Sequence, residues 1–280
     1  CAYFCTNEQT LKGIRTILFF FFLCGISLQF HAQQKIGVVL SGGGATGLVH
    51  IGVLKALEEN QIPIDYICGT SAGALVGSMY ACGWTPKEME AYATSPSFQM
   101  MTTGTIPSGR RYLYRESDPD ASMLALPFSP DSLLTTSIPM NVIRPRFLDV
   151  EMLRIMGVTG ALVGKDFNKL LVPFRCVASD VIHKKSVVFD SGDLNAAVRA
   201  SMTFPLYINP IKIDDIIYFD GGLYNNFPVN VLYNEFNPDF IIGCNVADNG
   251  VLPDEHNFIG LLDHMTEPPR IITYLVRKGF

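Results

Sequence analysis

Short, largely apolar runs recur along this chain, and each has the length of a single strand. They lie at residues 36–40, 66–68, 172–178, 186–189, 216–219 and 240–246. Such a run predicts a strand that is covered on both faces, as in the centre of a parallel sheet. Between the first two runs, apolar residues follow helical spacing at Leu48, Ile51, Leu54 and Leu57. Strand, helix and strand in this order predict an α/β fold with a mostly parallel central sheet flanked by helices.

Further helical patterns complete one domain. They lie at residues 72–81, 143–156 and 194–201, and Gly83 and Pro86 end the first of these. The stretch at 95–141 is less regular and contains many prolines and serines. The chain has 280 residues, which is enough for one large domain with a buried core. We place this domain at residues 33–247 and interpret residues 248–280, where the pattern weakens, as a linker or a partial C-terminal element.

The N-terminal residues 1–32 have the features of an export signal. Lys12 and Arg15 precede a short apolar run at 17–23, and Ala32 stands just before polar residues. A positive segment, a short apolar segment and a small residue are typical of a signal peptide, here cut after Ala32. An uncleaved N-terminal anchor is the alternative, because Phe30 fits the cleavage position poorly.

Composition excludes some partners. The net charge is −5 and no cluster of Lys and Arg is interleaved with aromatic residues, so the sequence predicts no nucleic-acid surface. Within the predicted domain the cysteines stand singly in apolar segments, at Cys68, Cys82, Cys176 and Cys244. This spacing indicates buried free thiols rather than a metal site, and we predict neither a metal nor a cofactor.

One strand-to-helix junction has the G-x-S-x-G pattern of a nucleophile elbow. The residues are Gly69, Thr70, Ser71, Ala72 and Gly73. Glycines on either side of a sharply turned serine leave room for the turn, and the serine hydroxyl is then presented at a helix N-terminus. The simpler alternative is a loop glycine followed by a serine that caps the helix.

A second glycine-rich loop follows the first predicted strand. It contains Gly42, Gly43, Gly44 and Ala45, whose backbone N–H groups can surround a phosphate or the oxyanion of an acyl-transfer reaction. Together with Gly47 the loop also fits the dinucleotide-binding fingerprint. That function needs an acidic residue at the end of the second strand, but Asp65 stands at the beginning of that strand.

A reactive serine also needs a base. A serine–aspartate–histidine order would require His256 or His264, whereas His50 has the position of a structural side chain. Asp220 ends a predicted buried strand and is followed by Gly221 and Gly222. At the edge of the sheet this carboxylate could meet Ser71, although an aspartate in an ordinary glycine turn explains the same spacing.

Four motifs in order resemble the patatin-like phospholipase family. They are Ser41 to Gly47, Gly69 to Gly73, Ala200 to Pro205, and Asp220 to Gly222. The resemblance implies a three-layer α/β/α fold and a serine–aspartate dyad without histidine, with Ser71 as nucleophile and Asp220 as base. It also implies an oxyanion hole in the glycine loop, formed by N–H groups of Gly43, Gly44 and Ala45. The implied substrates are phospholipids or other acyl lipids, cleaved without calcium chemistry.

One residue departs from the family pattern, since Thr46 stands where arginine or lysine is usual. The departure puts the rate and the headgroup preference in question. An exported chain of this kind is similar to the bacterial subgroup that continues into POTRA and outer-membrane barrel segments. We therefore expect a location in the periplasm, in the outer membrane or outside the cell, with a C-terminal extension of that type as a further expectation.

The stretch from Ser95 to Met156 is the natural place for a lid or an acyl-chain groove. Arg144, Arg146 and Arg154 among apolar residues could contact a membrane surface, but an amphipathic core helix explains the same pattern. Two other functions also fit parts of the sequence. One is an α/β-hydrolase esterase with a serine–aspartate–histidine triad, and the other is a non-catalytic lipid- or nucleotide-binding module.

Overall fold

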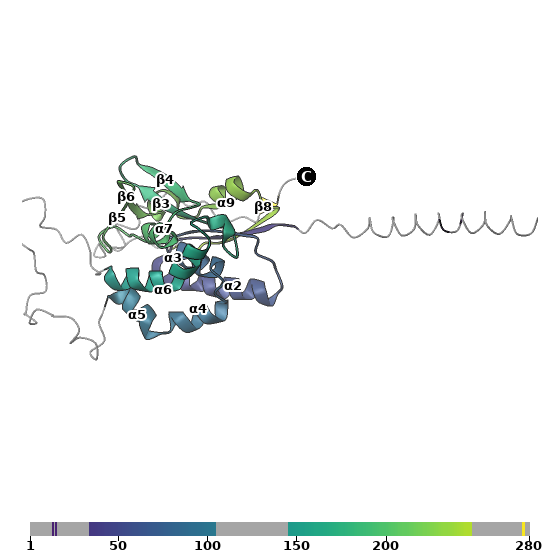
Figure 1. Cartoon of the computed structure of the whole chain (residues 1–280), viewed down its shortest axis with the longest axis horizontal. Helices are drawn as coiled ribbons and strands as arrows, with labels where there is room; N and C mark the ends of the chain where they lie inside the picture. The colour runs from purple at the N-terminus through teal and green to yellow at the C-terminus, as the bar shows by residue number, and fades with distance from the viewer. Residues whose placement is uncertain (1–12, 14, 16–33, 105–144, 248–275, 278–280) are drawn as a thin grey trace, which may run out of the picture. The chain divides into compact units, whose positions relative to one another are not determined.

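The computed structural model describes residues 34–104 and 145–247, together with residues 13, 15, 276 and 277 (Figure 1). The chain divides into two units, Cys1–Gln34 and Lys35–Phe280, and the fold belongs to the second. Most of the export signal, most of the predicted lid stretch and most of the C-terminal segment lie outside the described residues. In the described part of the chain, no helix is long and apolar enough to cross a bilayer.

An eight-stranded mixed sheet forms the centre of the described part. Its strands are β1 (Ile36–Leu40), β2 (Tyr66–Thr70), β3 (Phe174–Asp180), β4 (Lys185–Phe189), β5 (Ile211–Ile213), β6 (Ile216–Asp220), β7 (Phe240–Cys244) and β8 (Val276–Arg277). The order is β5-β6-β3-β2-β1-β7-β8, and β4 pairs with β3. The central strands β7, β1, β2 and β3 are parallel, whereas β4, β5, β6 and β8 join them through antiparallel pairs. The predicted α/β fold with a parallel centre is confirmed.

Helices cover both faces of this sheet. They are α2 (Val49–Glu59), α3 (Ala72–Ala81), α4 (Pro86–Ala93), α5 (Pro96–Thr103), α6 (Arg146–Leu162), α7 (Leu194–Ser201), α8 (Gly222–Asn225) and α9 (Val229–Phe236), with 3-10 turns η1 (Gly44–Leu48) and η3 (Phe167–Lys169). Alternate side chains of β1 belong to different cores: Val38 packs in the core with α2, α3, α4, α6 and α7, and Val39 packs with α9. Helices α2, α4 and α6 lie on the opposite side of the sheet from α9 (Figure 1). The result is the three-layer arrangement that the sequence predicted.

Two helices differ in extent from the sequence prediction. Pro86 was expected only to end the preceding helix, but it opens α4, where Thr85 and Glu88 form a capping box. The predicted helix at 143–156 begins at Arg146 and continues to Leu162. Its apolar stripe, Leu148, Met152, Ile155 and Met156, is buried in the core. Core packing thus accounts for the amphipathic pattern, and contact of this helix with a membrane stays a prediction.

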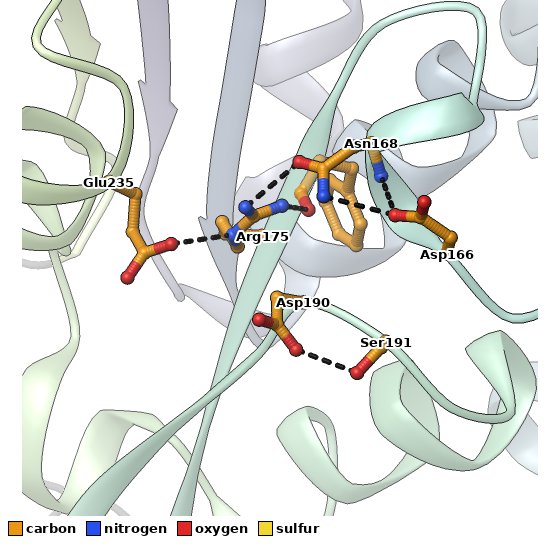
Figure 2. A network of polar contacts seen from close by, with 7 residues as sticks. Asp166, Asn168, Arg175, Asp190, Ser191 and Glu235 are labelled. Carbon is orange, nitrogen blue, oxygen red and sulfur yellow. Dashed lines mark hydrogen bonds and ion pairs between the residues drawn. The ribbon is translucent and has the colours of Figure 1, made fainter.

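A buried arginine connects β3 to both helical layers, away from the carboxyl end of the strand. The Arg175 guanidinium donates to Glu235 of α9 at 3.1 Å and to Asn168 of η3 at 2.9 Å (Figure 2). It also lies over the Phe236 ring at 4.5 Å from the centroid. Because removal of one partner leaves a buried charge uncompensated, this network fixes β3 within the layers. The candidate site lies further along the same strand, beside Val177 and Ala178.

Candidate active site

The carboxyl ends of β2 and β6 meet beside the middle of β3. Thr70, the last residue of β2, pairs with Val177, and Asp220, the last residue of β6, pairs with the next residue, Ala178. Strand β4 pairs with both Val177 and Ala178 and occupies the other edge of β3. Strands β2 and β6 therefore share one edge of β3 and run toward each other from opposite ends. This arrangement, rather than a parallel β6, brings Ser71 and Asp220 together.

Ser71 occupies the sharp turn that the sequence predicted. Its backbone has φ 53° and ψ −122°, a strained conformation for a residue with a side chain, and it is the N-cap of α3. A Cβ added at Gly69 would lie 2.4 Å from the carbonyl oxygen of Gly73, and one at Gly73 would lie 2.3 Å from that of Leu40. Both flanking glycines are thus required by close backbone approach, and the turn presents the serine at the beginning of a helix.

The Ser71 hydroxyl donates a hydrogen bond to the Asp220 carboxylate, with Oγ 2.6 Å from Oδ2. The carboxylate is held from its other side, because the N–H of Gly222 donates to Oδ1 at 2.8 Å. Asp220 is buried, with 4% of its surface exposed. A distance of 2.6 Å is typical of a hydroxyl bound to an ionised carboxylate. The pair therefore has the geometry of a nucleophile hydrogen-bonded to its base.

Gly221 fills the narrow space between the two strand ends. A Cβ at this position would lie 2.1 Å from the Val177 carbonyl oxygen and 2.8 Å from the Thr70 side chain. The N–H of Gly221 donates to the carbonyl oxygen of Ser201 at 3.3 Å. The two glycines after Asp220 thus have different functions: Gly221 permits close approach, and Gly222 holds the carboxylate.

The glycine loop lies beside Ser71, since a Cβ at Gly42 would be 3.1 Å from the Ser71 Cβ. The N–H of Gly42 is already donated to the carbonyl oxygen of Asn226 at 3.1 Å. Among the described residues, no acceptor is bound to the N–H groups of Gly43, Gly44 and Ala45. Gly44 has φ 57°, in the region that favours glycine. Of the four predicted oxyanion-loop residues, Gly42 therefore shapes the loop, and the other three retain N–H groups for a ligand.

The side chain of Thr46 contacts the backbone of the glycine loop and of the segment after β7. Its hydroxyl lies 2.7 Å from the carbonyl oxygen of Gly43 and 3.0 Å from that of Val246. The side chain thus links the glycine loop to the segment after β7. The threonine supplies a short contact within the loop.

The histidines that the structure describes are bonded to partners other than Ser71. His50 is fully buried, with Nε2 2.8 Å from the Ser41 carbonyl oxygen and Nδ1 3.1 Å from Cys244 Sγ. Burial lowers its pKa, so the neutral ring is favoured. Its Nε2–H then donates to Ser41, and its Nδ1 accepts from the thiol. His183 is exposed and bonds Asp180 at 2.6 Å, while His256 and His264 lie outside the described residues.

The described part of the chain contains no cluster of metal ligands. Within residues 34–104 and 145–247, no group of three or more His, Cys, Asp or Glu side chains is placed to hold a metal ion. The four described cysteines are free thiols, and burial raises the pKa of Cys68 and Cys176. Buried thiols of this kind are inert packing residues.

Sequence reasoning assigned no chemistry to two residues that contribute to the site. Ser201 belongs to the Ala200 to Pro205 motif and accepts the N–H of Ser71 through its hydroxyl at 2.9 Å. Asn226 accepts the N–H of Gly42, and the preceding carbonyl, of Asn225, accepts from the Thr70 hydroxyl at 2.9 Å. The Ala200 to Pro205 motif includes Ser201 without indicating its bond to Ser71, and no motif includes Asn226, because the partners of both residues lie far away in sequence.

Fold and site together define a three-layer α/β protein in which a serine on a strand-to-helix turn is bonded to a buried aspartate beside a glycine loop. The patatin-like phospholipase family model matches residues 38–233. The chain belongs to this family.

Curated relatives are much longer than this chain. A patatin-like phospholipase domain-containing protein of Caenorhabditis elegans is 30% identical over 216 residues, covering 76% of this chain and 14% of that protein. A lysophospholipase of Mycosarcoma maydis is 32% identical over 210 residues, covering 75% of this chain and 9% of that protein. Among solved structures, VipD from Legionella pneumophila aligns with a TM-score of 0.37 and 15% identity, over 69% of this chain and 47% of that one.

Proposed function

We propose that this chain is a serine-dependent lipid acyl hydrolase of the phospholipase A or lysophospholipase type. The observation that carries the proposal is the 2.6 Å hydrogen bond from Ser71 to the buried carboxylate of Asp220, beside a loop with N–H groups that bind no other acceptor in the described part of the chain. Membership of the patatin-like phospholipase family and the name of the fungal relative, a lysophospholipase, support a lipid substrate.

In the first half-reaction, Ser71 Oγ attacks the ester carbonyl carbon while Asp220 accepts the hydroxyl proton. The carbonyl oxygen becomes an oxyanion, which the N–H groups of Gly43, Gly44 and Ala45 stabilise. Asp220 then returns the proton to the departing alcohol oxygen as the ester bond breaks, leaving an acyl-enzyme. In the second half-reaction, water attacks the acyl-enzyme with the same proton transfers, releasing fatty acid and restoring Ser71.

An aspartate is a weak base at its ordinary pKa of about 3.9. It can act here because the hydroxyl proton is already shared at short distance and the site partly excludes water. Asp220 is 4% exposed, and both of its carboxylate oxygens are engaged, by Ser71 and by Gly222. These contacts keep the acceptor oriented toward the serine, which compensates for low basicity through positioning.

Fatty-acid release from phosphatidylcholine and lysophosphatidylcholine tests the activity, with p-nitrophenyl butyrate as a soluble ester. We expect Ser71→Ala and Asp220→Asn each to lower hydrolysis by at least about 100-fold. Excess EDTA should leave the wild-type rate unchanged. Full activity in either variant would exclude the dyad, and loss of activity in a His256→Ala, His264→Ala double variant would instead favour the histidine triad.

Export is part of the proposal, supported by the charge and apolar pattern of residues 1–32. Expression in a Gram-negative host with this N-terminus should give a processed protein that begins at Gln33. A cytosolic protein with the mass of the unprocessed chain would contradict export.

A further inference from the structure

One buried serine on α7 contacts both halves of the candidate site. Ser201 has no exposed surface. Its hydroxyl oxygen accepts the N–H of Ser71 at 2.9 Å and its proton is donated to the carbonyl oxygen of Val177 at 2.6 Å. Its own carbonyl oxygen accepts the N–H of Gly221 at 3.3 Å. Ser201 therefore bonds the nucleophile, the strand edge on which β2 and β6 meet, and the residue after Asp220.

The hydroxyl of Ser201 has a fixed direction. Its single proton points to Val177, so a lone pair is left facing the N–H of Ser71. Ser71 has φ 53°, and a strained backbone persists only where surrounding contacts hold it. The Ser201 hydroxyl is the contact made to the N–H of this strained residue. An alanine at 201 would leave that N–H and the Val177 carbonyl without this partner.

Asp220 is held by the same segment two residues further along. The N–H of Asp220 donates to the carbonyl oxygen of Thr203 at 2.8 Å. The Thr203 hydroxyl in turn bonds Arg199, whose guanidinium also pairs with Asp149 at 2.9 Å. The backbone N–H groups of both dyad residues are therefore attached to residues 201 and 203. The last residue of α7 and the turn that follows it thus contact the backbone of both Ser71 and Asp220.

We propose that Ser201 is a positioning residue for the dyad: its hydroxyl orients the Ser71 backbone so that Oγ stays within hydrogen-bonding distance of the Asp220 carboxylate. The inference rests on the proposed function and adds a residue that touches neither substrate nor the reacting atoms. It concerns the chemical step, because a displaced nucleophile changes the transition state and not the binding of the lipid.

The test compares kcat and KM for p-nitrophenyl butyrate, and the rate of covalent labelling by a fluorophosphonate, in Ser201→Ala, Ser201→Thr and Ser78→Ala. Ser78 is a matched control, since it is equally buried and its hydroxyl donates to a backbone carbonyl, that of Leu75, at 2.8 Å. We expect Ser201→Ala to lower kcat and the labelling rate by roughly 10- to 100-fold with KM little changed. Ser201→Thr, which keeps the hydroxyl, should recover most of this loss, and Ser78→Ala should stay within about two-fold of wild type.

Thermal unfolding of each variant separates positioning from general destabilisation. A Ser201→Ala protein with wild-type kcat would overturn the inference, as would a folded Ser201→Thr protein as slow as the alanine variant. Ser71→Ala is assayed in parallel. An active Ser71→Ala refutes the proposed function itself, whereas an inactive Ser71→Ala beside a fully active Ser201→Ala refutes only the role of Ser201.

Discussion

Gly221 offers a sharp test of how β2 and β6 meet, through the single change Gly221→Ala. The backbone at this position has φ −62° and ψ −21°, which any residue adopts without strain. Space alone is limiting: the added Cβ would lie 2.1 Å from the Val177 carbonyl oxygen and 2.8 Å from Thr70 Cγ2. One of these neighbours is the backbone of β3, and the other is the residue before Ser71.

The magnitude follows from these distances. Ordinary contact begins at 3.4 Å, so the Cβ at 2.1 Å must retreat by more than 1 Å. Because Asp220 is the adjacent residue, its carboxylate is displaced relative to Ser71. A misplacement of about 1 Å at a reacting group costs on the order of 100-fold in rate. Overpacking of a filled interior costs about 1–3 kcal/mol in the free energy of unfolding.

Steady-state hydrolysis of a soluble ester and urea unfolding measure the two effects. Gly52→Ala is the control, because a Cβ at Gly52, within α2, meets nothing within 4 Å. In a helix this control change should raise stability by up to about 1 kcal/mol and leave kcat unaltered. If Gly221→Ala unfolded at the wild-type urea concentration with kcat within about three-fold of wild type, the close meeting of the two strand ends would be refuted.

Three further changes test the surroundings of the site. The Ser179 hydroxyl is buried without a hydrogen-bond partner in the described part of the chain. Ser179→Ala should therefore keep the free energy of unfolding, measured in urea, or raise it by up to about 1 kcal/mol. A loss of about 2 kcal/mol or more would contradict this expectation. Because burial lowers the pKa of His50 below 6.5, the unfolded chain binds more protons than the folded chain, and the free energy of unfolding should fall as pH drops below about 6.5. Urea titrations at several pH values should show a smaller fall for His50→Gln than for the wild type. A fall of equal size in both proteins would show that His50 is not its cause. Thr46→Val removes the hydroxyl contact to Gly43 and should lower kcat roughly five-fold, the equivalent of about 1 kcal/mol. Thr46→Ser keeps the hydroxyl and should have a kcat near that of the wild type. Equal kcat values in the valine and serine variants would show that the contact is dispensable.

The sequence was most informative where structure is local. The strand-to-helix turn at Ser71 is determined by the two glycines beside it and by the small residues of α3, so its position and form could be predicted. The same holds for the glycine loop and for Asp220 at the end of a buried strand. In each case neighbouring residues carry the signal, because steric limits act over a few residues.

The direction of β6 was not predictable in the same way. Asp220 was expected at the carboxyl edge of a mostly parallel sheet, and it reaches Ser71 from a strand that is antiparallel to β3. Strand direction depends on pairing partners distant in sequence, and the apolar pattern of a strand is the same in either direction. The bonds of Ser201 and Asn226 are likewise long-range, since Ser201 and Ser71 are 130 residues apart.

The start of α4 was predictable from the sequence. Thr85, Pro86 and Glu88 form a capping box with proline at the first helical position, which predicts a helix start. Proline was interpreted only as the end of the preceding helix. Helix α9 has a weaker sequence signal than α4, because it is short and only Val231 and Leu232 are buried. These two residues pack against the second face of the sheet.

The central claim is that Asp220 activates Ser71. The most direct measurement is the rate at which a fluorophosphonate labels the protein, with the adduct located by peptide mass spectrometry, in wild type and in Asp220→Asn. The account predicts an adduct on Ser71 in the wild type, formed at least about 100-fold more slowly in the variant. An adduct on another residue, or equal labelling of Ser71 in both proteins, would contradict it.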